Sequence, residues 1–225
     1  MASFETHLTV TTTVTGVITI PLLSSGVVTT SEGVLLLFFG VIGGMLPDID
    51  SDHSIPIQIA FKILSLILPL ILVLNFANDM PLLYIAGAWF VASLIFYLVF
   101  TYIFLPITSH RGIFHTIPMG ILLGELTALF MMHSLDIADS ISIFSGIYIS
   151  FGFMIHLILD EVYSVNLIGA SLKRSFGSAF KLYDSNNIIG SIIINIMAIG
   201  LFFYLPNIIK ILSNISNLLQ NMPIY

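Results

Sequence analysis

The sequence predicts an all-α fold, a polytopic helical bundle in a membrane with about six to seven transmembrane helices. Of its 225 residues, 57% are hydrophobic and 8% are charged, and the mean hydropathy is +1.08. Soluble globular domains contain about 45–50% apolar and about 25% charged residues. The apolar residues also form separate stretches of about the 20 residues that a bilayer crossing needs. We expect a single membrane domain over residues 1–225.

The first apolar stretch, residues 8–23, is rich in Thr and Val, which favour strands. We assign it to a helix, because a lone strand cannot pair its backbone in lipid and the alternating strands of a barrel are missing. Six further spans follow at residues 33–46, 57–76, 82–105, 113–132, 141–160 and 188–205. The tail from residue 207 has apolar residues at helical spacing and is expected to be an amphipathic or partly embedded helix.

The second span is short for a crossing of about 20 residues. It contains Gly40, Gly43 and Gly44, and small residues let helices approach closely, so we expect tight contact with a neighbouring helix. Pro47 fixes its own φ and disfavours the helical region for Leu46. The span should therefore stop at Leu46, and an extended turn should follow.

This turn contains Asp48, Asp50, Asp52 and His53. Closely spaced carboxylates repel one another and are stabilised when a cation neutralises them. Half of a metal site is one interpretation, and a solvated acidic turn is the alternative that this stretch alone leaves open. The chain has no cysteine, so any metal must be held by nitrogen and oxygen.

Seven crossings sort the polar residues between the two sides of the membrane. The N-terminus and the connections after the second, fourth and sixth spans share one side, which receives five of the six histidines, whereas His133 falls on the other side. Five of the six basic residues also belong to the histidine-rich side, and Lys210 does not. Such an excess of Lys and Arg is typical of the cytoplasmic face.

Two pairs on the histidine-rich side have the spacing of one helical turn. His156 and Asp160 are four residues apart at the end of a span, so they face the same side of a helix. Two ligands of one ion would have this spacing, and a hydrogen bond between the two side chains is the alternative. His7 and Thr11 repeat the spacing at the start of the first span, where His7 is a further candidate ligand.

The loop before the fifth span contains His110, Arg111 and His115. Gly112 lets the loop fold His110 back toward His115. An Arg beside metal ligands suits a bidentate contact with phosphate or carboxylate. The alternative for Arg111 is an anchor to lipid headgroups at the membrane interface.

Four ordered motifs and a basic segment are present: H-x-x-x-T at 7–11, L-P-D-I-D at 46–50, H-R-G-x-x-H-T at 110–116, H-L-I-L-D-E-V-Y-S at 156–164 and K-R-S-F-G at 173–177. From His7 to about Asp184, the combination resembles the bacterial YdjM-like (LexA-regulated type) family of membrane-bound, metal-dependent hydrolases. The resemblance implies a hydrolase of the bacterial inner membrane, with phosphoester or lipid-phosphate chemistry expected. Some relatives carry His directly after L-P-D-I-D, where this chain has Ser51, so the resemblance assigns no ligand role to His53.

The predicted metal ligands are His7, Asp48, Asp50, His110, His115, His156 and Asp160. Seven donors exceed the four that hold one zinc ion, so we expect two divalent ions, Zn or Mn, with a bridging carboxylate at the cytoplasmic face. The predicted catalytic residues are Asp50, Arg111 and Glu161, and the predicted substrate-binding residues are Arg111, Lys173, Arg174 and Lys181. The expected partners are the bilayer and a phosphorylated lipid, without nucleic acid. The alternatives are a divalent-cation transporter or channel and a scaffold with a structural metal.

Overall fold

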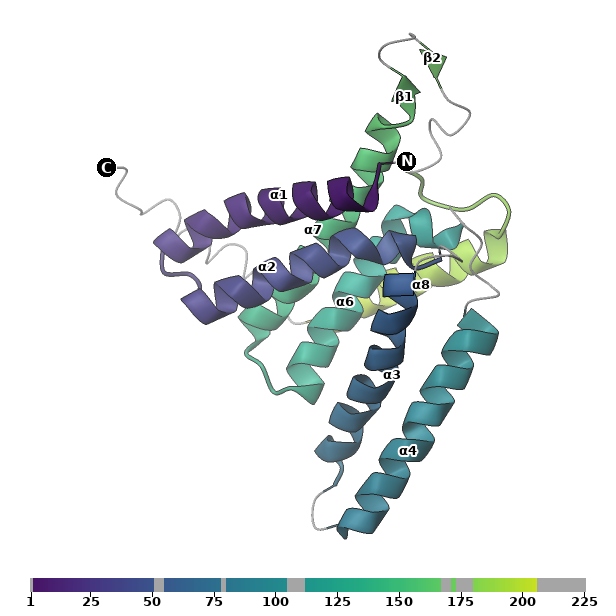
Figure 1. The fold of residues 1–225 in the computed structure, drawn as a ribbon. Coiled ribbons are helices and arrows are strands. Elements are labelled where there is room, and N and C mark those ends of the chain that lie inside the picture. Colours follow the sequence, from purple (N-terminus) through teal and green to yellow (C-terminus); the bar gives the residue numbers. More distant parts are fainter. Residues whose placement is uncertain are drawn as a thin grey trace. The chain divides into compact units, whose positions relative to one another are not determined.

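The computed structural model describes residues 2–50, 55–77, 80–104, 112–166, 171–172 and 180–205, and these residues are almost entirely helical (Figure 1). The predicted all-α membrane fold is confirmed. The chain packs as two compact units, residues 1–47 with 113–225 and residues 48–112, and each unit is described by itself. The single domain over residues 1–225 stays a prediction.

The larger unit contains α1 (Phe4–Ser24), α2 (Thr30–Met45), α6 (Ile117–Ser134), α7 (Asp139–Val162) and α8 (Ile188–Tyr204). After α7, a short antiparallel ladder joins β1 (Val165–Asn166) to β2 (Ser171–Leu172). Within the described residues, four helices are long and apolar enough to cross a membrane: α1, α2 with its extension to Asp48, α6 and α7. The 24 residues of α7 extend over about 36 Å at about 1.5 Å per residue, which exceeds a hydrocarbon core of about 30 Å.

The smaller unit is built from α3 (Ile55–Asn75) and α4 (Leu82–Leu98), which continues into the π-helical turn η2 (Val99–Phe104). The two helices pack together, and the Trp89 indole N–H donates to the Leu66 carbonyl at 2.9 Å. The described part of α3, together with α4 and α8, forms apolar helices shorter than 18 residues. Each of the seven predicted spans therefore coincides with a helix.

Side-chain caps set the beginnings of α1 and α2. The Ser3 hydroxyl accepts the Thr6 N–H at 3.2 Å, and Thr29 forms a reciprocal capping box with Glu32, which satisfies N–H groups that a helix start leaves without acceptors. Between the two helices, Gly26 has a φ of 69°, a left-handed conformation that glycine adopts readily after a helix end. These local signals fix where the chain reverses between α1 and α2.

The prediction of an extended turn after Leu46 is wrong. The α-helix ends at Met45 as expected, but residues 46–50 form a 3-10 helix, η1 (Leu46–Asp50). Leu46 is itself helical, with φ −59° and ψ −38°. The tighter turn accommodates Pro47, because the first residues of a helix have no intrahelical acceptor and the missing proline N–H costs nothing there.

Glycines bring α1, α2 and α7 close together, as the sequence predicted for the second span. Gly44 faces Thr11 of α1, and Gly152 of α7 faces the backbone of Gly40, in both cases so closely that an added Cβ would overlap its neighbour. Gly43 lies against the α7 backbone in the same way. Without side chains in the way, the backbones approach as in tightly packed membrane helices, and the polar ends of the three helices come together.

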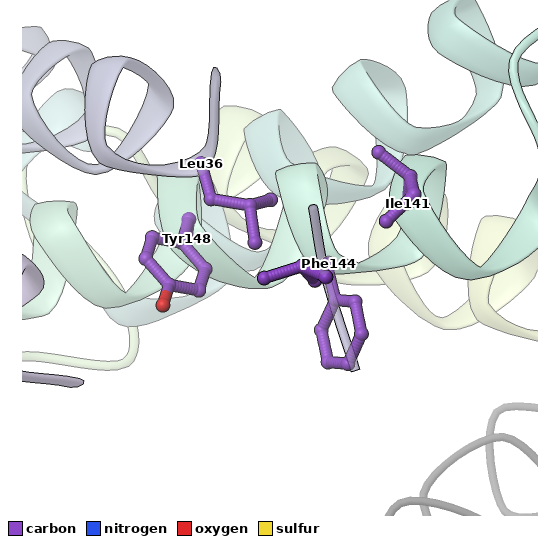
Figure 2. Close-up of a cluster of buried hydrophobic side chains, with 5 residues drawn as sticks. Leu36, Ile141, Phe144 and Tyr148 are labelled. Atoms are coloured by element: carbon purple, nitrogen blue, oxygen red, sulfur yellow. The ribbon is translucent and has the colours of Figure 1, made fainter. Parts of the chain in front are cut away.

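An apolar cluster packs α2 against α7 in the half of these helices away from the polar ends. Leu36 of α2 packs with Ile141, Phe144 and Tyr148 of α7 (Figure 2), and Val28 completes the cluster. The Tyr148 hydroxyl reaches the Thr19 hydroxyl of α1 at 3.0 Å, so its one polar atom is satisfied inside the bundle. The cluster fixes the relative positions of α1, α2 and α7 from which the polar groups project.

Candidate metal centre

Four of the predicted metal ligands lie together in the larger unit. His7 is in the first turn of α1, His115 ends the 3-10 turn η3 (Ile113–His115) before α6, and His156 and Asp160 are in the last turns of α7. The relative exposure of all four is 2% or less. Figure 1 shows why distant parts of the sequence meet, since the N-terminus lies beside the end of α7 that leads to β1.

The Asp160 carboxylate is the centre of this cluster. The Nε2 atom of His7 is 3.4 Å from Oδ1, and the Nε2 atoms of His115 and His156 are each 4.0 Å from Oδ2. The rings of His7 and His156 are stacked, with centroids 3.7 Å apart and an interplanar angle of 10°. Three imidazoles thus present the same nitrogen toward one carboxylate.

These distances suit a shared cation. Two ligands of one tetrahedral zinc ion are about 3.4 Å apart when each bond is about 2.1 Å long. Ligand atoms of His7, His156 and Asp160 all lie within 4.8 Å of one another, so small side-chain movements would bring them to that spacing. The separation of 4.0 Å between His156 Nε2 and Asp160 Oδ2 exceeds a hydrogen bond for this atom pair, contrary to the simple paired alternative.

A backbone carbonyl determines the tautomer of His156. Its Nδ1 is 2.8 Å from the Gly44 oxygen, and a carbonyl oxygen can only accept, so Nδ1 must carry the proton. The lone pair is then on Nε2, the nitrogen nearer to Asp160. Histidine ligands of metals commonly have their second nitrogen oriented by such a contact. The donor set and its surroundings therefore fit a divalent metal ion.

Two backbone groups of this cluster were not predicted from the sequence. One is the Gly44 carbonyl, and the other is the Ala2 N–H, which donates to Asp160 Oδ1 at 3.3 Å. Every residue has a backbone carbonyl and every residue except proline has an N–H, so residue identity gave no signal for these contacts. At the edge of the cluster, His7 Nδ1 and Thr11 Oγ1 are buried and have no hydrogen-bond partner within the described residues.

Lys181 lies on a segment that runs beside the start of α6. Its carbonyl accepts the Ile117 N–H at 3.0 Å, two residues after His115, and its ammonium pairs with the buried Asp184 carboxylate at 3.3 Å. The ion pair fixes the lysine near the histidine-containing turn. Its contact with substrate stays a prediction.

Glu161 directly follows Asp160 and is partly exposed, and successive helix residues point in different directions, so its catalytic role stays a prediction. Asp48 and the backbone of Asp50 belong to the smaller unit, and their part in the centre also stays a prediction. The other predicted site residues lie outside the described residues: His110, Arg111, Lys173 and Arg174, together with Asp52 and His53.

His133 is far from the cluster, as the sorting of polar residues between two sides predicted. It lies near the end of α6, whereas His115 precedes the start of this helix, and the 16 residue steps from Ile117 to His133 correspond to about 24 Å. Its ring contacts Tyr204 at a centroid distance of 6.3 Å, and its Nδ1 is 3.1 Å from the Leu129 carbonyl. Its surroundings therefore contain no member of the buried cluster.

The model of the family described as YdjM inner membrane protein matches residues 1–215 of the chain. No curated protein and no solved structure matches the chain. The matched range contains all four buried donors and extends past the motifs to include α8.

Proposed function

The chain belongs to the YdjM inner membrane protein family, and we propose that it is a metal-dependent hydrolase of the bacterial inner membrane. The observation that carries the proposal is the burial of three imidazoles around one carboxylate at one end of apolar helices. Ionisable groups at membrane depth are costly and are functional candidates by default. We further propose that the helices cross the membrane several times and that the cluster faces the cytoplasm, where basic residues are usually enriched.

His7, His115, His156 and Asp160 would hold a first ion, and Asp48, Asp50 and His110 would contribute to a second. When bound, zinc or manganese would activate water and stabilise the charge that develops on a phosphoryl oxygen. The structure supports the first group through the convergent Nε2 atoms and the fixed tautomer of His156. Support for the second group comes from the sequence. Asp48 follows Gly44, whose carbonyl contacts His156 Nδ1, by only four residues.

The proposed substrate is a phosphoester or phosphorylated lipid. The planar guanidinium of Arg111 would bind two phosphate oxygens, and Lys181, Lys173 and Arg174 would bind the anionic headgroup. Glu161 would serve as the group that exchanges a proton with the reacting oxygen. A lipid could enter sideways from the cytoplasmic leaflet, which gives a reason for placing the reaction inside a membrane protein.

A divalent-cation transporter is the rival that the same cluster allows. It would need ligands along a route through the bilayer. The described helices next to the cluster supply few: α1 after His7, and α7 between Asp139 and His156, contain no histidine or charged residue. Between His115 and His133, α6 contains a single one, Glu125. The cluster at one end therefore favours a reaction at the membrane surface over passage through it.

The test is hydrolysis of a panel of phosphorylated lipids by metal-replete protein in vesicles. Arg111→Ala should keep its metal and lose most activity, and Arg111→Lys should recover only part, because an ammonium lacks the two-pronged donor geometry. His156→Ala should lose both metal and activity. Full activity of Arg111→Ala would point to an uncharged scissile bond, and metal-free wild-type protein would exclude the hydrolase proposal.

A further inference from the structure

A second ionisable group lies deep in the larger unit, away from the histidines. Glu125 is the ninth of the 18 residues of α6, so about 12 Å of helix separates it from either end. Its relative exposure is 6%, and neither carboxyl oxygen has a hydrogen-bond partner within the described residues. An ionisable side chain in the middle of a membrane-crossing helix is a functional candidate, and the proposed hydrolysis gives it no role.

Glu125 lines a cavity of about 430 Å³ between α6, α7 and the end of α8. This volume falls in the range of about 300–1,000 Å³ typical of small-molecule sites. The other polar side chain of the lining, Ser150, already donates to the Gly120 carbonyl at 3.0 Å. The remaining surface is mainly apolar and includes Ile121, Ala128, Ile147, Phe151, Met154 and Phe202.

The Glu125 carboxyl and the apolar lining together indicate which kind of ligand would fit the cavity. An ionised carboxylate without a partner is very costly in apolar surroundings, so the cavity suits a neutral carboxyl group, which offers one O–H donor and one carbonyl acceptor. A hydroxyl group can use both at once. A phosphate or ammonium head would bring a charge to the middle of the bilayer, which is costly.

We propose that this cavity binds a long-chain lipid alcohol, with its hydrocarbon chain against the apolar lining and its hydroxyl group hydrogen-bonded to Glu125. The proposal rests on the unpaired carboxyl and the apolar cavity, and it does not depend on metal binding or hydrolysis. It assigns a binding site in the middle of the membrane, separate from the histidine cluster at the end of α7.

A hydrophobic carbodiimide tests the site on the full chain in vesicles. The carboxyl O–H adds across a C=N bond of the reagent, and the adduct rearranges to a stable N-acylurea that mass spectrometry locates. We expect labelling at Glu125, slowed several-fold by a long-chain alcohol and unaffected by the alkane of the same length. Glu32 is the control carboxyl, because Thr29 already binds it at the start of α2 and the alcohol should not change its labelling.

Substitution separates hydrogen bonding from charge. With a photoreactive long-chain alcohol, Glu125→Gln should keep crosslinking to α7, because an amide also donates and accepts, and Glu125→Leu should lose most of it. Crosslinking that Gln abolishes as fully as Leu would contradict the neutral hydrogen bond. Equal protection by alcohol and alkane would remove the role of the head group. If the carbodiimide labels Glu125 only in Lys210→Ala, the Lys210 ammonium of the same chain pairs with this carboxyl in the wild-type protein. That result would overturn the proposal.

Discussion

Replacing Gly44 by alanine tests how helix packing supports the buried cluster. This glycine has two functions in the structure: it lets α1 approach α2, and its carbonyl accepts the proton of His156 Nδ1 at 2.8 Å. An added Cβ would lie closest to Thr11 Oγ1, then 2.6 Å from Thr11 Cγ2 and 2.8 Å from Thr11 Cβ. Contacts this short force the two helices apart, and they displace the carbonyl that orients the imidazole.

The two consequences differ in size. Overpacking of this kind costs about 1–3 kcal/mol, and the better helix propensity of alanine offsets about 1 kcal/mol. We therefore expect the free energy of unfolding to fall by about 0–2 kcal/mol, a small change. Loss of the group that orients a histidine ligand typically lowers metal affinity by about 10–100-fold, and this is the larger effect expected for Gly44→Ala.

The assay is metal competition with a chelator, combined with thermal unfolding in detergent. Gly200→Ala is the matched control, because no atom of the described residues lies within 4 Å of a Cβ at Gly200 in α8, and it should leave metal affinity unchanged. Adding Thr11→Ala to Gly44→Ala removes the two closest atoms and should restore part of the affinity, a coupling expected of residues in contact. Wild-type metal affinity in Gly44→Ala would refute the role assigned to the carbonyl.

Three further outcomes are expected from the structure. Asp160→Ala should reduce the metal content of the purified protein, measured by elemental analysis, because three imidazole nitrogens face this carboxylate; unchanged content would exclude it as a ligand. His133→Ala should leave metal content at the wild-type level, since about 24 Å of α6, from Ile117 to His133, separates it from the His115 turn. Tyr148→Phe should lower the free energy of unfolding by about 1 kcal/mol, because it removes the buried hydrogen bond to Thr19; an unchanged melting temperature in detergent would contradict this.

The helices and the grouping of the donors could be predicted because long-range constraints in a membrane are simple. A span must be apolar and long enough to cross, and each crossing alternates the side on which a polar end lies. These two rules placed His7, His115, His156 and Asp160 together although they are distant in sequence. The spacing of four residues also predicted correctly that His156 and Asp160 share one side of α7.

The details that depend on backbone geometry could not be predicted. The Gly44 carbonyl and the Ala2 N–H are backbone groups that any residue other than proline would offer there. The helical Leu46 contradicts the usual effect of a following proline. Glu125 is a different case, since a lone acidic residue inside an apolar span is visible in the sequence. The predicted site consisted of residues in loops and at span ends, and Glu125 belongs to neither group.

The hydrogen bond between Ala2 and Asp160 joins residues 158 positions apart, and this has a consequence for assembly. During synthesis, α1 is available to the membrane long before α7 exists, so the cluster cannot form until most of the chain has been made. Metal loading would then be a late event that ties α1 to α7. Since a ligand that binds only the assembled state stabilises it by about 2.7 kcal/mol at 100 times its Kd, chelation should lower the free energy of unfolding and loosen the contact between the start of α1 and the end of α7.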